Sequence, residues 1–188
     1  MGNKLLAFFS KRTNRWSLSI MGGLLFVFMF FLVPSVYGRL SNGISPCRAL
    51  DTYLYYTPDQ ALEVLRCFGP SRGTYLIVEL SLDLIYPVVY TIFFIMVLTA
   101  LLKDIKIMPG STNVQGIHLL PLLPILAWLF DLLENLGISG MITLFPDFPQ
   151  WLAMVASGCT LLKWVFVLNT IVIITVLSIG CLKKRYRS

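Results

Sequence analysis

The stretch LLPILAWLFDLLENLGI, residues 122–138, decides the fold class. It is apolar enough to lie in a bilayer, yet it carries Asp131, Glu134 and Asn135 near its middle. Apolar residues continue on both sides, and the run over about 117–145 exceeds the roughly 20 residues that cross a bilayer as an α-helix. We interpret it as a transmembrane helix whose polar side chains face other protein segments rather than lipid.

Three further apolar runs reach this length, at about 16–38, 74–102 and 151–182. Hydrophobic residues make up 57% of the 188-residue chain and charged residues only 13%, against about 25% charged residues in soluble domains. This composition excludes a disordered chain, a nucleic-acid-binding module and an ordinary cytosolic enzyme domain. The sequence predicts an all-α polytopic membrane protein, a four-transmembrane-helix bundle forming a single domain over residues 1–188.

The first run also has features of a secretory signal peptide, because basic residues precede it and Val36-Tyr37-Gly38 fits a cleavage site. Its apolar stretch, Leu18–Val36, is longer than the usual core of about 7–15 residues. We therefore expect a retained membrane anchor.

The distribution of basic residues predicts the orientation of the chain. Four Lys and Arg residues precede the first run, two lie between the second and third runs, and four follow the fourth run. The first loop holds four over a longer stretch, and the last loop holds none. By the positive-inside rule both termini are expected to be cytoplasmic, in a plasma or inner membrane. The net charge of +6 then reports membrane orientation rather than nucleic-acid binding.

The first loop, 39–73, is the only sizeable segment predicted outside the membrane. Thr57, Pro58 and Gln60 predict a helix start with a capping box, and Gly69-Pro70 predicts its end. We expect a short helix on the outer membrane surface, acting either as a plain connector or as a lid. Cys47 and Cys67 lie in this loop and can form a disulfide if it faces an oxidising compartment.

Ionisable side chains inside the predicted spans are costly and usually face the bundle interior. Helical spacing places the polar residues of each of the last three runs on one face, and a rise of about 1.5 Å per residue brings them to overlapping depths. A pair of Lys163 with Glu134 or Asp131 is geometrically reasonable. The candidate ligand-binding residues are Glu79, Asp83, Tyr86, Tyr90, Trp128, Asp131, Glu134, Asn135 and Lys163.

The buried charges do not balance, because four carboxyl groups face the single ammonium group of Lys163. Protons, water or a bound cation must offset the excess. Glu79 is nearest the outer surface and is expected to be hydrated. No CxxC motif occurs and the chain has one histidine, so we expect neither a metal site nor a cofactor.

Several stretches resemble known membrane proteins. YTPDQALEVLRCFG, ELSLDLIYPVVYTIFF, LLPILAWLFDLLENLGI and WLAMVASGCTLLKW together resemble an uncharacterised four-helix membrane family of bacterial type, which supports the topology. Glu79 and Pro87, with His118 and Pro124-Ile125-Leu126 followed by acids, are similar to sterol-isomerase-like (EXPERA) proteins, which include the sigma-2 receptor. That resemblance implies a four-helix protein with acidic residues in a lipid-accessible pocket.

Three functions remain open. The first is binding of a small molecule, a cation or a lipid headgroup in a buried acidic pocket, with transport requiring an oligomer. The second is an accessory subunit of a larger membrane complex, in which the polar cluster locks helix packing. The third is an intramembrane lipid enzyme, which ranks last because the sequence has no nucleophile–histidine pair or phosphate loop. The expected partners are membrane lipids, other membrane subunits or a second copy of the chain, and not nucleic acid.

Overall fold

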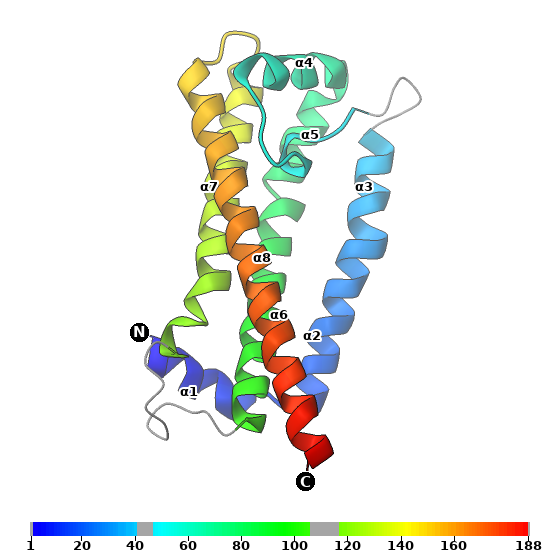
Figure 1. The fold of residues 1–188 in the computed structure, drawn as a ribbon. Helices are drawn as coiled ribbons and strands as arrows, with labels where there is room; N and C mark the ends of the chain where they lie inside the picture. The colour runs from blue at the N-terminus through cyan, green and yellow to red at the C-terminus, as the bar shows by residue number, and fades with distance from the viewer. Residues whose placement is uncertain (1, 41–46, 106–116, 188) are drawn as a thin grey trace.

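The computed structural model describes residues 2–40, 47–105 and 117–187, and within these ranges it is helical with no β-strand. Four segments are long and apolar enough to cross a membrane, which confirms the predicted all-α architecture. Both termini lie at one end of the bundle and helix α4 lies at the other, here called the α4 end (Figure 1). Residues 106–116, between the second and third spans, lie outside the described residues. The four candidate segments are Arg15–Val36, Pro58–Asp104, Leu122–Thr143 and Gln150–Lys184, and the second of them also includes α4 at the end of the bundle.

The first span consists of α2 (Arg15–Val27), a π-helical stretch η1 (Phe28–Leu32) and α3 (Val33–Leu40). A capping box fixes its start: the Ser17 N–H donates to the Asn14 side chain at 2.7 Å, and the Asn14 N–H donates to the Ser17 hydroxyl at 2.9 Å. The apolar run at 16–38 did not signal the π-helical stretch, since composition alone does not distinguish helix types.

A short helix before the first span, α1 (Gly2–Arg12), lies across the terminal end of the bundle (Figure 1). Tertiary contacts hold it there, because the Lys103 ammonium donates to the backbone carbonyl of Ser10 and the Leu6 side chain is fully buried. No apolar run of membrane-spanning length covers α1, so the sequence did not predict it. Helices of this length are marginal on their own, so docking rather than local propensity decides whether one forms.

A short helix is present where the sequence predicted one, as α4 (Pro58–Phe68). The capping box is present, with the Gln60 N–H donating to Thr57 Oγ1 at 3.3 Å and the Thr57 N–H donating to Gln60 Oε1 at 2.9 Å. Gly69 ends the helix with a φ of 50°, a conformation that favours glycine, and the 3₁₀ turn η3 (Gly69–Ser71) follows.

The single helix predicted over 74–102 is wrong: the structure has two helices, α5 (Arg72–Glu79) and α6 (Leu82–Asp104). The break is at Ser81, whose hydroxyl donates to the Ile77 carbonyl at 2.5 Å while its N–H donates to the Val78 carbonyl at 3.1 Å. The side chain thus replaces the helical backbone donor, which interrupts the ladder of hydrogen bonds. As a consequence, the residues before and after the break do not share one helix face.

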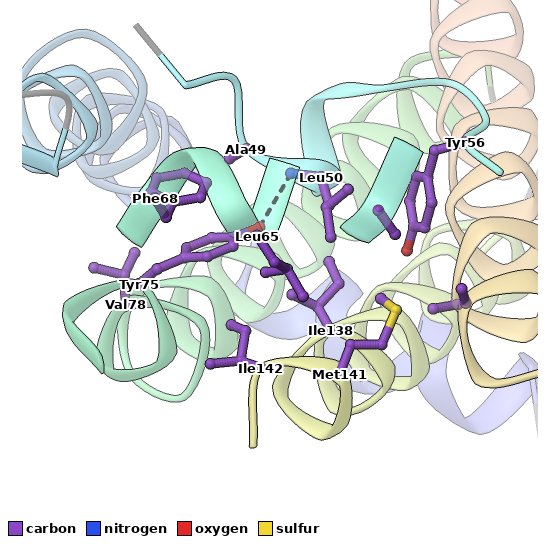
Figure 2. Packing of buried hydrophobic residues seen from close by; sticks show 13 residues of the cluster. Ala49, Leu50, Tyr56, Leu65, Phe68, Tyr75, Val78, Ile138, Met141 and Ile142 are labelled. Atoms are coloured by element: carbon purple, nitrogen blue, oxygen red, sulfur yellow. Dashed lines mark hydrogen bonds between the residues drawn. The ribbon is translucent and has the colours of Figure 1, made fainter. Parts of the chain in front are cut away.

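The buried apolar core lies at the α4 end, where α4, α5, α7, α8 and the 3₁₀ turn η2 (Leu50–Thr52) meet (Figure 2). The Leu50 side chain is fully buried, and its N–H donates to the Tyr75 hydroxyl at 3.0 Å, drawn as the dashed line in Figure 2. The Phe68 and Tyr75 rings stack with their centroids 4.4 Å apart. This core anchors the first loop to the bundle.

The third and fourth spans are α7 (Leu122–Thr143), which follows the 3₁₀ turn η4 (Ile117–Leu119), and α8 (Gln150–Arg187). They pack closely because Gly137 has no side chain: a Cβ built on it would lie 2.7 Å from the Ala156 Cβ and 3.4 Å from the Ala156 Cα. Small residues at such contacts let transmembrane helices approach.

Gly137→Ala is expected to lower the free energy of unfolding by about 1–2 kcal/mol, because the added methyl group must push α7 and α8 apart. Gly158→Ala in α8 is the matched control, since nothing lies within 4 Å of a Cβ at Gly158. Unfolding in mixed micelles measures both, and Ala156→Gly in the Gly137→Ala background should restore stability. Equal stability of the Gly137 and Gly158 variants would contradict the close contact.

Candidate ligand-binding cavity

The predicted ion pair of Lys163 is confirmed with both carboxylates. Lys163 Nζ lies 2.5 Å from Glu134 Oε2 and 3.4 Å from Asp131 Oδ1. Two hydroxyl groups complete the network, since Thr160 donates to Glu134 Oε1 at 2.7 Å and Tyr90 donates to Asp131 Oδ2 at 2.8 Å. The network joins α6, α7 and α8 in the middle of the spans, where such bonds are not replaced by water.

Asn135 satisfies a backbone carbonyl that Pro87 leaves without its helical donor. Proline has no N–H, so the carbonyl of Asp83, four residues earlier in α6, lacks its usual intrahelical partner. The Asn135 side-chain NH₂ donates to that carbonyl at 2.7 Å. Asn135 is 1% exposed, and its side-chain oxygen accepts no hydrogen bond from the described residues. The side-chain NH₂ of Asn135 therefore bonds the backbone of α6, while its side-chain oxygen has no hydrogen-bond partner among the described residues.

A cavity of about 420 Å³ lies beside this network, between the first span and the other three. Its polar side comes from α6, α7, α8 and η2, and its apolar side comes from the first span and the remaining turns of α6 and α8. The lining residues of the polar side are Asp51, Thr52, Asp83, Tyr86, Tyr90, Asp131, Asn135 and Lys163. Those of the apolar side are Leu25, Met29, Val33, Pro87, Phe94, Trp164, Val167 and Ile171.

The lining of the cavity includes side chains of the first span and α8 that are also exposed on the surface of the bundle. Met29 of η1 is 50% exposed and Ile171 of α8 is 43% exposed, although both line the cavity. Asp83, Asp131 and Lys163 are each at most 7% exposed. The cavity thus combines an apolar mouth at the level of the membrane with a polar interior, which is the general form of an amphiphile site.

Most of the predicted site residues come together at this cavity. Glu134 does not line it and lies behind it, fully buried and paired with Lys163. The predicted residues that line it are Asp83, Tyr86, Tyr90, Asp131, Asn135 and Lys163.

Glu79 and Trp128 do not line the cavity. The expectation that Glu79 is hydrated near the outer surface is wrong, because its side chain is fully buried next to the α4-end core. The break at Ser81 separates Glu79 from the face of α6 that carries Asp83. Trp128 is half-buried one helical turn before Asp131, and Trp164 of α8 supplies the indole at the cavity instead.

Sequence reasoning missed Asp51, Thr52, Trp164 and the residues of the first span. Asp51 and Thr52 lie in a loop, where no periodicity marks a buried position. The first span is apolar on all sides, so its sequence gives no sign of which residues line a cavity. Asp51 lies near enough to Lys163 and Glu134 for its charge to act on both.

The charge of the cavity is predominantly acidic. Among its described lining residues, Asp51, Asp83 and Asp131 carry carboxyl groups, and Lys163 carries an ammonium group that is paired with Asp131 and Glu134. Among the described residues, no group of three potential metal-ligating side chains is gathered in one place.

Comparison with protein-family models, curated proteins and solved structures finds no match for this chain. The resemblances drawn from the sequence therefore remain expectations, and the cavity is interpreted from its own chemistry.

Proposed function

We propose that this protein binds an amphipathic small molecule with a positively charged head in the cavity between its first span and α8. The observation that carries the proposal is a cavity of about 420 Å³ within the bundle, whose described lining joins the carboxyl groups of Asp51, Asp83 and Asp131 to a set of apolar side chains. The head would lie near Asp83 and Asp131, which line the polar part of the cavity. The apolar tail would lie against Met29 and Ile171.

We also propose that the termini are cytoplasmic in a plasma or inner membrane. Lys and Arg residues are concentrated in the terminal segments, and both termini lie at one end of the bundle (Figure 1). The α4 end then faces the opposite compartment. The disulfide between Cys47 and Cys67 supports this orientation, because such bonds persist on the oxidising side of a membrane.

Dodecylamine in lipid nanodiscs is expected to bind more tightly than dodecanol, which has the same chain length but an uncharged head. Asp83→Asn and Asp131→Asn should each weaken dodecylamine binding by about 10–100-fold, the range for hydrogen bonds to charged groups. Dodecanol binding should change little. Native mass spectrometry measures occupancy, and thermal unfolding shows whether each variant remains folded.

Asp59→Asn is the matched control, because Asp59 is an exposed carboxyl on α4 outside the cavity. It should bind dodecylamine as the parent protein does. Equal binding of dodecylamine and dodecanol, or unchanged dodecylamine binding by folded Asp83→Asn, would contradict the proposal.

The second candidate function is an accessory subunit whose polar network locks helix packing. Two observations favour it: Lys163 ties α7 to α8 through Glu134, and the first span exposes Phe26, Phe30 and Phe31 on its outside. Such an apolar face leaves room for lipid or another membrane subunit. Absence of dodecylamine binding, together with a loss of stability in the carboxyl variants, would favour this function over the first.

A further inference from the structure

The first loop supplies part of the wall of the cavity. Asp51 and Thr52 of η2 line it, together with residues from all four spans. Asp51 is the lining carboxyl that lies outside the spans, so it comes from the aqueous end of the site. A positive group in the polar part of the cavity would have Asp51, as well as Asp83 and Asp131, among the residues that line its site.

Contacts on both sides hold η2 in place. Before Asp51, the N–H of Leu50 donates to the Tyr75 hydroxyl within the buried core (Figure 2). After it, the N–H of Tyr56 donates to the Ser157 hydroxyl of α8 at 2.8 Å. The turn itself is closed by the Arg48 guanidinium, which donates to the Thr52 hydroxyl at 2.9 Å.

The disulfide is a third anchor of the same segment. It joins Cys47, three residues before Leu50, to Cys67 near the end of α4, with the two Cα atoms 5.9 Å apart. Since α4 packs on the core through Leu65 and Phe68, the bond ties the start of the loop to a rigid element. Without the bond, the start of the loop would lose its covalent link to α4, and the contacts of Ala49, Leu50 and Tyr56 would remain.

We propose that Asp51 contacts the charged head of the ligand, and that the Cys47–Cys67 disulfide is the device that positions it. This inference rests on the proposed function. It adds a carboxylate that determines specificity and the disulfide that positions this carboxylate. Charge selectivity, rather than binding of the apolar tail, is the property that Asp51 would control, because its side chain offers the ligand a carboxylate.

The test compares dodecylamine and dodecanol binding to four proteins in nanodiscs: the parent, Asp51→Asn, the double variant Cys47→Ser/Cys67→Ser, and the triple variant. Asp51→Asn should weaken dodecylamine binding by about 10-fold and leave dodecanol binding unchanged. The cysteine double variant should weaken dodecylamine binding by about 3–10-fold, because Asp51 is no longer held in position. The triple variant should bind like Asp51→Asn alone, since the disulfide acts through Asp51.

Tyr75→Phe provides a second route to the same effect without touching the cysteines. It removes the acceptor for the Leu50 N–H, keeps the ring stacked on Phe68, and should reduce the preference for dodecylamine. Asp59→Asn again serves as the exposed control. Thermal unfolding confirms that each variant is folded before its binding is compared.

The outcomes separate this inference from the function on which it rests. If the parent protein shows no preference for dodecylamine, the proposed function and this inference both fail. If the preference exists and depends on Asp83 but not on Asp51, only the inference fails. If the cysteine variant and Asp51→Asn act additively, the disulfide does not work through Asp51 and the positioning role is overturned.

Discussion

Lys163→Met is expected to lower the free energy of unfolding by about 3–5 kcal/mol, the range for breaking a buried ion pair by removing one partner. The substitution keeps the length and apolar stem of the side chain but removes the ammonium group. Glu134, fully buried, and Asp131, 6% exposed, would then share the network without a cation. Unfolding by SDS titration in mixed micelles measures the difference.

Neutral replacements should restore most of this stability. In Glu134→Gln/Lys163→Met the uncompensated charge on Glu134 is gone, so the double variant is expected to be more stable than Lys163→Met alone. Lys183→Met, at an exposed position near the end of α8, should change the free energy of unfolding by no more than about 0.5 kcal/mol. A Lys163→Met protein as stable as the parent would show that Lys163 does not hold the three helices together.

Asn135→Leu is expected to lower the free energy of unfolding by about 3 kcal/mol, because it removes the hydrogen bond that the Asn135 amide donates to the Asp83 carbonyl inside the bundle. Leucine has a similar volume, so the effect reports the lost hydrogen bond rather than a new void. Asn169→Leu is the matched control: Asn169 is an exposed amide whose NH₂ donates to the Val165 carbonyl of its own helix. That change should be close to neutral.

A double-mutant cycle with Pro87→Ala tests whether Asn135 stabilises the protein through its hydrogen bond to the Asp83 carbonyl. Alanine restores an N–H that can bond the Asp83 carbonyl within α6, so the Asn135 amide is no longer needed for it. In the Pro87→Ala background, Asn135→Leu should therefore lower the free energy of unfolding by less than it does in the parent. The difference should be at least about 1 kcal/mol, the net value of one hydrogen bond. Equal costs in the two backgrounds would show that Asn135 stabilises the protein in another way.

Charge and helix periodicity predicted the pairing at the centre of the bundle. Residues three or four apart lie on one side of a helix, and a buried lysine needs a carboxylate, so Lys163 could be matched with Asp131 or Glu134 from the sequence. The same reasoning placed Glu79 with Asp83, Tyr86 and Tyr90. That placement assumed an unbroken helix, and the Ser81 hydroxyl breaks it through a bond that the residue type alone does not reveal.

The sequence by itself determined the four membrane-spanning segments, the capping box at Thr57 and the ion pairs of Lys163. These features follow from burial and hydrogen bonding within a segment, or from the cost of an unpaired charge, all of which composition and spacing express. Only the tertiary structure decided that Asp51 and Met29 line the cavity and that Glu134 lies behind it. It also decided that the Asn135 amide bonds the Asp83 carbonyl. Those positions depend on how separate segments pack together. The sequence periodicity of an apolar segment does not show which of its side chains will contact another segment.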